Sequence, residues 1–179
     1  MVSTPISTGE KGALRARLEE NGEKWLGCIR DVTEEQAQFS PGEGRWNILQ
    51  VAEHVAVAER QMLAMWKKLM QPGTSPREKD EAIIDAQGNH RKKNQAPERS
   101  LPTGRFTRLR DTEAEFELNR QASITALHAA EGLREKVVEH PLAGPVDGYQ
   151  LFLVMAMHPL RHVYQVEEIK AAPGYPAAK

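Results

Sequence analysis

Clear helix-start signals are the feature that most constrains how this chain folds. The clearest lies at Asn47, whose side chain can cap a helix while Gln50, three residues on, returns a hydrogen bond to the cap residue. Trp46 and Val51 flank this capping box as a hydrophobic staple. An apolar seam follows at helical spacing: Ile48, Ala52, Val55, Met62, Trp66 and Leu69. The pattern predicts a long helix with one face in the core.

The segments before this helix carry similar signals. Ser7 and Glu10 form a capping box that opens a first long helix. Its apolar stripe consists of Leu14, Leu18, Trp25 and Ile29. Thr33 and Gln36 form another capping box, which predicts a short helical turn before Pro41.

Two more long helices are expected in the second half of the chain, over residues 107–130 and, after a cap at Asp147, over residues 148–170. Apolar contacts of the former should come from Phe116, Leu118, Ala122 and Leu127. The connection over residues 71–105 is longer than usual between bundle helices, and residues 80–86 can form a short helix within it. No segment shows a convincing strand pattern, so we predict an all-α fold.

The overall composition narrows the class of protein. A chain of 179 residues suits one domain, which we expect to span residues 1–179 with its core at about 7–171. The net charge of −1 gives no strong field toward nucleic acid or anionic membrane. The chain lacks a signal peptide pattern and any apolar run of the ~18 residues that a membrane span needs. We therefore expect a cytoplasmic protein with a small-molecule partner.

The single cysteine, Cys28, excludes an intramolecular disulfide, and its apolar neighbours predict a buried, inert thiol. The segment from Arg91 to Arg110 is locally positive, because Glu98 is its one acidic residue. Its basic residues are Arg91, Lys92, Lys93, Arg99, Arg105, Arg108 and Arg110. A solvated loop is the favoured interpretation, and an anion-attracting rim beside a pocket is the alternative.

Three histidines form a candidate metal site. His158 and His162 lie four residues apart on the last predicted helix, so their imidazoles share one face and can bind one ion. A third nitrogen has to come from another element, and His54 lies beside the apolar seam of the second long helix. Taken alone, His54 would more often be a satisfied core residue. Together the three residues predict a metal site.

Four short motifs resemble, in order and spacing, the DinB/YfiT-like superfamily: residues 45–54, 102–105, 141–148 and 158–165. This resemblance implies an up-down-down-up four-helix bundle with a long crossover between the second and third helices, often found as a homodimer. It also implies a divalent metal ion, commonly nickel or zinc, at one end of the bundle. Carried over residue by residue, the metal ligands are His54, His158 and His162.

The resemblance favours a metal-dependent enzyme that transfers a low-molecular-weight thiol to an electrophile, because some relatives are thiol-dependent transferases. Three neutral imidazoles leave the ion its full charge and an open position for water or substrate. Such an ion lowers the pKa of a bound water or thiol. Metal-dependent hydrolysis and a non-catalytic metal-binding bundle are the alternatives, and no catalytic residue is assigned beyond the metal centre.

One residue departs from a regular helix at the proposed site. Pro159 has no N–H to bond the Met155 carbonyl, which predicts either a distorted site or a tolerated kink with a freed carbonyl. We favour the second outcome, because the outer residues of the motif are intact. Gln165 and Arg161 are candidates both for orienting the ligands and for ordinary packing.

Acidic residues near the histidines do not predict a protease. Pro159 stands where a zincin motif would place its glutamate, so a zincin mechanism does not apply. Glu53 and Glu59 lie near His54 in the sequence, but helical geometry places neither at the metal.

Overall fold

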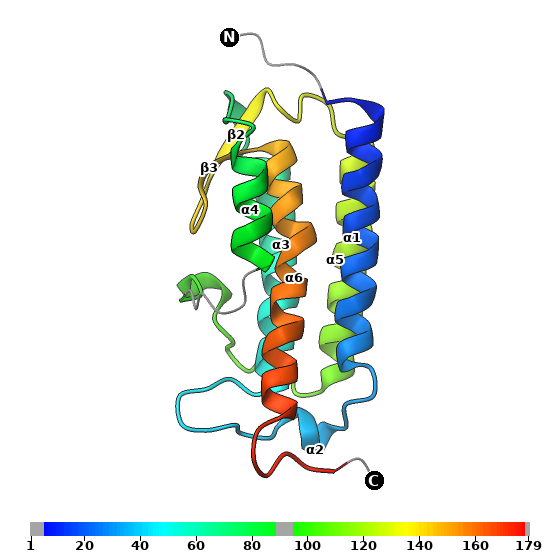
Figure 1. Ribbon diagram of the computed structural model, residues 1–179, viewed down its shortest axis with the longest axis vertical. Coiled ribbons are helices and arrows are strands. Elements are labelled where there is room, and N and C mark those ends of the chain that lie inside the picture. Colours follow the sequence, from blue (N-terminus) through cyan, green and yellow to red (C-terminus); the bar gives the residue numbers. More distant parts are fainter. Residues whose placement is uncertain (1–5, 89–94, 178–179) are drawn as a thin grey trace.

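Four long helices form the body of the protein in the computed structural model, which describes residues 6–88 and 95–177 (Figure 1). They are α1 (Thr8–Ile29), α3 (Ile48–Lys68), α5 (Leu109–Ala129) and α6 (Gly148–Lys170). Helices α1 and α6 run in one direction and α3 and α5 in the other, with the long crossover between α3 and α5. This is the predicted up-down-down-up four-helix bundle.

The helices begin where their capping residues predict. In the described residues, four N-cap side chains accept a hydrogen bond from the backbone N–H three residues on. They are those of Ser7, Thr33, Asn47 and Asp147, and each capping box is complete. The short helix α2 (Glu34–Ala37) follows the second of them. Helix α5 has no side-chain cap of its own, but the Leu109 N–H lies 3.2 Å from a carboxylate oxygen of Glu34, which satisfies a free donor of its first turn.

Most predicted core residues are buried, including Leu14, Trp25, Val55, Phe116 and Leu127. Two predictions of core contacts were wrong: Leu69 is 51% exposed and Leu118 is 69% exposed. Leu69 is the C-cap of α3, where the chain leaves the bundle. Leu118 comes two residues after the buried Phe116, and two residues turn a helix by roughly 200°, so it faces solvent.

A small antiparallel sheet at one end of the bundle is absent from the all-α prediction. Its strands, in the order β1-β2-β3, are β1 (Gln71–Pro72), β2 (Lys136–His140) and β3 (Gly144–Asp147). The β2–β3 hairpin pairs Val137 with Asp147 and His140 with Gly144, whose φ of 64° favours glycine. Such short strands, one of them containing Pro145, leave almost no alternating pattern in the sequence.

The crossover is held against the bundle by a buried arginine. It contains α4 (Lys79–Gly88), which confirms the predicted short helix, and the 3₁₀ helix η1 (Glu98–Ser100). Helix α4 packs along α6 (Figure 1). Arg134 lies 2.6 Å from Asp80 of α4 and 2.9 Å from Asp147, the cap of α6. The ion pairs therefore tie α4 to the start of α6.

No helix in residues 6–88 or 95–177 is long and apolar enough to cross a membrane.

Cys28 is half-buried rather than fully buried, and its Sγ lies 3.3 Å from a Glu167 carboxylate oxygen. Burial raises the pKa of the Cys28 thiol to about 12, which agrees with an unreactive thiol.

Candidate metal centre

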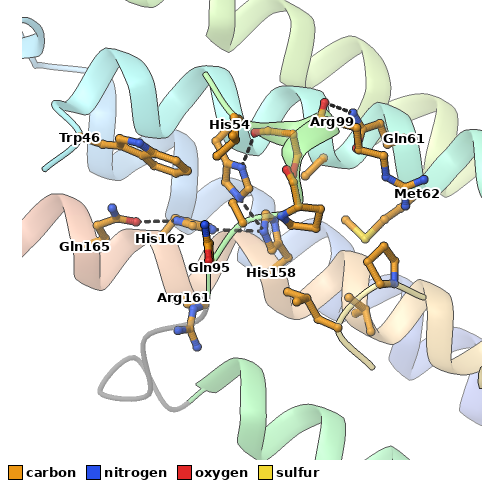
Figure 2. A pocket seen from close by; sticks show the side chains of 18 of the residues that line it. Trp46, His54, Gln61, Met62, Gln95, Arg99, His158, Arg161, His162 and Gln165 are labelled. Atoms are coloured by element: carbon orange, nitrogen blue, oxygen red, sulfur yellow. Dashed lines mark hydrogen bonds between the residues drawn. The ribbon is translucent and has the colours of Figure 1, made fainter. Parts of the chain in front are cut away.

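A cavity of about 530 Å³ opens beside α3 and α6, a size typical of small-molecule sites (Figure 2). Its walls come from these two helices, from the segment around η1 and from the β2–β3 turn. His54, His158 and His162 lie in this wall, and Trp46 lies beside them with its ring centroid 5.2 Å from that of His54. The predicted histidines therefore line the same cavity.

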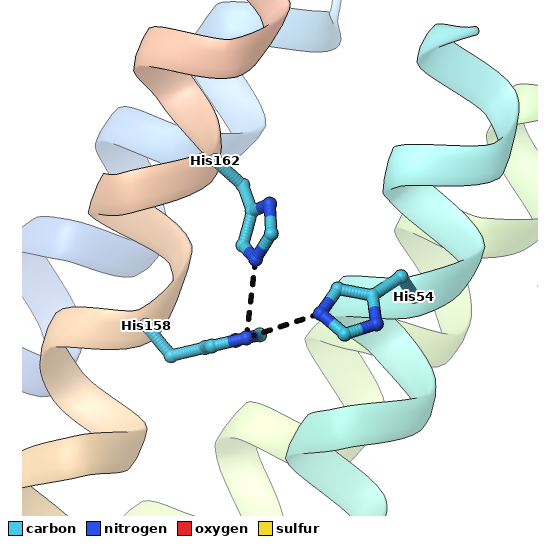
Figure 3. A group of neighbouring side chains, drawn as sticks. All are labelled: His54, His158 and His162. Carbon is cyan, nitrogen blue, oxygen red and sulfur yellow. Dashed lines mark hydrogen bonds between the residues drawn. The ribbon is translucent and has the colours of Figure 1, made fainter. Parts of the chain in front are cut away.

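The three imidazoles turn the same nitrogen toward one point (Figure 3). His158 Nε2 lies 3.2 Å from His54 Nε2 and 3.1 Å from His162 Nε2. The three candidate ligand atoms all lie within 4.8 Å of one another. The structure thus brings together, from α3 and α6, the residues that the sequence singled out.

Two of the outer ring nitrogens are held by acceptors. His54 Nδ1 lies 2.8 Å from the Ser100 carbonyl oxygen, and His162 Nδ1 lies 2.8 Å from Gln165 Oε1. Because both oxygens accept, each Nδ1 carries the proton and donates it. In the neutral rings, Nε2 of His54 and of His162 then has a free lone pair, as a metal ligand requires.

Hydrogen bonding within the cluster leaves these lone pairs incompletely satisfied. A single proton on His158 Nε2 can point well at one neighbour but not at both, so at least one short N···N contact leaves the lone pair of His54 or His162 without a donor. A positive ion among the three nitrogens removes this conflict. Three neutral imidazoles are also a common donor set for zinc, so the residues fit a divalent ion.

Burial keeps all three rings neutral near neutral pH. It lowers the pKa of His54, and it lowers the pKa of His158 well below its ordinary value, with a further contribution from the neighbouring histidines. Burial, reinforced by His54, lowers the pKa of His162 to about 3. Neutral imidazole is the form that binds metal.

Helix α6 continues through Pro159, and other helices supply the missing donors. The Met155 carbonyl, which the proline leaves without its helical partner, accepts from Arg120 Nη2 at 3.0 Å. The next carbonyl, that of Ala156, accepts from Asn21 Nδ2 at 3.1 Å. The expectation that the proline is tolerated is therefore confirmed, since the histidines on either side of it converge.

Arg120 belongs to a buried polar network that pairs the carboxylate of Glu59. Its guanidinium lies 3.0 Å from a Glu59 carboxylate oxygen and 2.7 Å from the Leu18 carbonyl. The Ser123 hydroxyl donates to the other Glu59 oxygen at 2.8 Å. Glu59 is thus paired by α5 and is not a metal ligand in this arrangement.

Glu53 supports the site from outside it. Its carboxylate accepts from the backbone N–H groups of Thr103, at 2.8 Å, and Gly104, at 3.1 Å, and Arg105 lies 3.6 Å away. These contacts fix the loop that directly follows η1, and Ser100, the last residue of η1, has the carbonyl that orients His54. Glu53 is fully buried and faces this loop, not the cavity lining.

Part of the basic segment agrees with the interpretation as a solvated loop, and part agrees with the interpretation as a rim beside a pocket. Arg105 and Arg108 pair with acidic residues, whereas Arg99 lines the cavity. Residues 91–93 lie outside the described part of the chain. Arg161 also lines the cavity, and it donates to the Ala86 carbonyl of α4 at 3.3 Å.

Among the residues of the cavity that sequence reasoning missed is a fourth histidine. His140, at the end of β2, is buried and lines the cavity with the adjoining turn. The residues around His140 are rich in Pro and Gly and predicted only a break between helices. The position of His140 has no helical spacing to the other histidines. Only the hairpin brings it to the cavity.

Comparisons with known proteins agree with this architecture. The family model of the DinB superfamily matches residues 17–166. YfiT from Bacillus subtilis, a solved structure described as a probable metal-dependent hydrolase with an unusual four-helix bundle topology, aligns with a TM-score of 0.63 and 16% identity, over 98% of this chain and 94% of that one. No curated protein matches the chain. Because the family model covers most of its length, the chain belongs to the DinB superfamily.

Proposed function

We propose that this protein is a metal-dependent enzyme whose divalent ion, nickel or zinc, is bound by His54, His158 and His162. The observation that carries the proposal is the convergence of three Nε2 atoms at the wall of a cavity of about 530 Å³. Three protein ligands leave a coordination position open toward the cavity. An ion bound there supplies Lewis acidity and lowers the pKa of a water or thiol that it binds.

Hydrolysis is the first candidate reaction, because the cavity offers no obvious protein nucleophile. No cysteine lines the described part of the cavity. The Ser100 hydroxyl donates to the Pro97 carbonyl at 2.9 Å and is buried. A nucleophile therefore has to enter from solution, and water is always present. The similarity in fold to YfiT, described as a probable metal-dependent hydrolase, supports this choice.

Transfer of a low-molecular-weight thiol is the second candidate, and the size of the cavity favours it. A water molecule occupies only about 30 Å³ of liquid volume, so a cavity of about 530 Å³ has room for a small thiol and an electrophile together. Met62 and Met65 contribute apolar, polarisable walls that suit a sulfur-containing ligand. The thiol would then be a co-substrate.

A paired assay separates the two reactions. Protein loaded with zinc or nickel is incubated with 4-nitrophenyl acetate without thiol, and with monochlorobimane plus a thiol such as cysteine or glutathione. Hydrolysis predicts release of nitrophenol in the first assay, whereas thiol transfer predicts metal-dependent loss of thiol in the second.

The matched variants are His54→Ala, in the site, and His128→Ala, which changes an exposed histidine of α5. We expect the active reaction to be lost in the first variant and retained in the second. If both variants keep the wild-type rates, or if neither reaction depends on metal, the three histidines do not carry the reaction and the proposal of a metal-dependent enzyme is wrong.

A further inference from the structure

His140 presents a hydrogen-bond donor to the cavity. Its Nδ1 accepts from two backbone N–H groups of the β2–β3 turn, those of Leu142 at 3.3 Å and Ala143 at 3.1 Å. A nitrogen that accepts carries no proton, so the proton of the neutral ring is on Nε2. Because the side chain lines the cavity, Nε2–H is the polar group that it offers there.

The ring is held in this neutral form. Burial lowers the pKa of His140 to about 4, and the positive charges of Arg99 and Lys79 contribute to the shift. His140 does not belong to the cluster of three histidines, and a protonated Nε2 cannot bind a metal ion. Within residues 6–88 and 95–177, no acceptor pairs with this Nε2.

Arg99 also lines the cavity, and its positive charge acts on His140. Its Nη2 lies 3.6 Å from the Met65 sulfur, a weak acceptor in the cavity wall, and no carboxylate in the described residues pairs with it. Its backbone is fixed, because the Arg99 carbonyl accepts from Gln61 Nε2 at 2.6 Å. Because Arg99 is exposed, its guanidinium is a cation at the rim of the cavity that lacks a carboxylate partner in the described residues.

The rest of the lining also favours an anion. Among the described residues, its other charged members are two arginines, Arg45 and Arg161, and a single acidic residue, Glu168. A cavity with this excess of positive charge attracts negatively charged ligands. One free guanidinium beside one neutral donor suits a singly charged group with two acceptor oxygens, and a carboxylate has this chemistry.

We propose that Arg99 and His140 bind a carboxylate group of the substrate, so that the reacting part of the same molecule faces the three histidines. This inference rests on the proposed function, because it assigns the substrate of that site to the class of carboxylic acids with a second, reactive group. Arg99 supplies the charge, and His140 supplies a donor whose direction is fixed by the β2–β3 turn.

Calorimetric titration of the zinc-loaded protein with benzoate, and with benzyl alcohol as a neutral analogue, tests this assignment. The variants are Arg99→Gln, which removes the charge, and His140→Asn, whose side-chain oxygen can still accept from the turn but which lacks the distant N–H. Arg110→Gln is the control, since it changes an exposed arginine of α5 that does not line the cavity.

We expect benzoate affinity to fall about tenfold or more in Arg99→Gln and about fivefold in His140→Asn, as the loss of a hydrogen bond to a charged group predicts. The affinity of these variants for benzyl alcohol should equal that of the wild type, and Arg110→Gln should bind benzoate as the wild type does. The proposal is overturned if wild-type protein does not bind benzoate, or if Arg99→Gln and His140→Asn bind it as the wild type does.

Zinc content, measured in every variant, separates this proposal from the metal proposal. Benzoate binding that depends on Arg99 in a protein without stoichiometric zinc would contradict the proposed metal function while supporting the carboxylate site. Stoichiometric zinc with benzoate binding that is independent of Arg99 would do the opposite.

Discussion

Two of the buried polar clusters of this bundle, the one around Arg120 and the three histidines, differ in how far the protein satisfies their hydrogen-bonding groups. We call the Arg120 cluster closed, because Glu59 and two backbone carbonyls, those of Leu18 and Met155, accept from the guanidinium nitrogens Nη1 and Nη2, and only the buried Nε lacks a partner in the described residues. The histidine cluster is bonded on its outer side at His54 and His162, but one inner proton cannot satisfy both of its inner contacts, at 3.1 and 3.2 Å. The difference teaches that a closed cluster holds helices together, whereas an open one is suited to a ligand.

The closed cluster should give the largest effect on stability. Arg120→Met leaves the buried Glu59 carboxylate without its ion pair and deprives two carbonyls of a donor, so we expect a loss of about 3–5 kcal/mol of unfolding free energy. Urea denaturation measures it. The double variant Arg120→Met, Glu59→Leu should recover part of the loss. A single-variant loss below about 1 kcal/mol would show that the cluster does not hold the helices.

The open cluster should behave in the opposite way. His162→Ala removes one proposed ligand, so zinc affinity should fall by more than about 100-fold, beyond the range for residues that only orient a ligand. The metal-free protein should lose less than about 1 kcal/mol, because the variant also relieves a close N···N contact. Calorimetry and urea denaturation give the two values, with His128→Ala as control. A large loss of stability without a change in zinc affinity would assign these histidines to packing.

Gln165, whose side-chain oxygen accepts from His162, should have a smaller effect on zinc affinity. Gln165→Leu removes the oxygen that fixes the His162 ring, so we expect zinc affinity to fall by about 10–100-fold with little change in stability. Gln165→Glu keeps an acceptor at this position and should retain most of the affinity. Equal affinities of the wild type and the leucine variant, measured by competition with a chelator, would mean that Gln165 only packs.

The stability of the metal-free protein should depend on pH through its buried histidines. The pKa of His140 is lowered to about 4, so the unfolded chain, with its ordinary value near 6.5, binds more protons over this interval. The unfolding free energy should therefore be fully present above about pH 6.5 and fall as the pH decreases toward about 4. His140→Asn should reduce this fall by roughly 1.4 kcal/mol or less per pH unit. Identical pH profiles of wild type and variant would contradict the burial of a neutral ring.

Pro159 should give the smallest effect. Pro159→Ala restores an N–H, but the Met155 carbonyl already accepts from Arg120, so the unfolding free energy should change by less than about 1 kcal/mol. Zinc affinity should stay within about threefold of the wild type, which is under 1 kcal/mol. A strong gain of stability would show that Arg120 does not replace the missing helical donor.

Local signals account for what the sequence predicted well. Capping boxes at Ser7, Asn47 and Asp147 depend on residues three positions apart, and the histidine pair on α6 depends on one helical turn. The place of His54 beside this pair followed from the resemblance to the family.

Contacts between distant segments account for what was missed. The partner of Glu59, the donor to the Met155 carbonyl and the place of His140 in the cavity all depend on segments far apart in the sequence. The short strands were missed because they carry little periodicity. The single domain, the cytoplasmic location and the homodimer stay predictions.

The central claim is that the three histidines bind a metal ion, and elemental analysis of protein purified without chelators tests it most directly. The comparison is between the wild type and the double variant His54→Ala, His158→Ala, with thermal melting before and after EDTA. We predict about one ion of nickel or zinc per wild-type chain, almost none in the double variant, and a lower Tm of the wild type after EDTA. The same trace of metal in both proteins, with no rise in Tm on adding nickel or zinc, would contradict the claim.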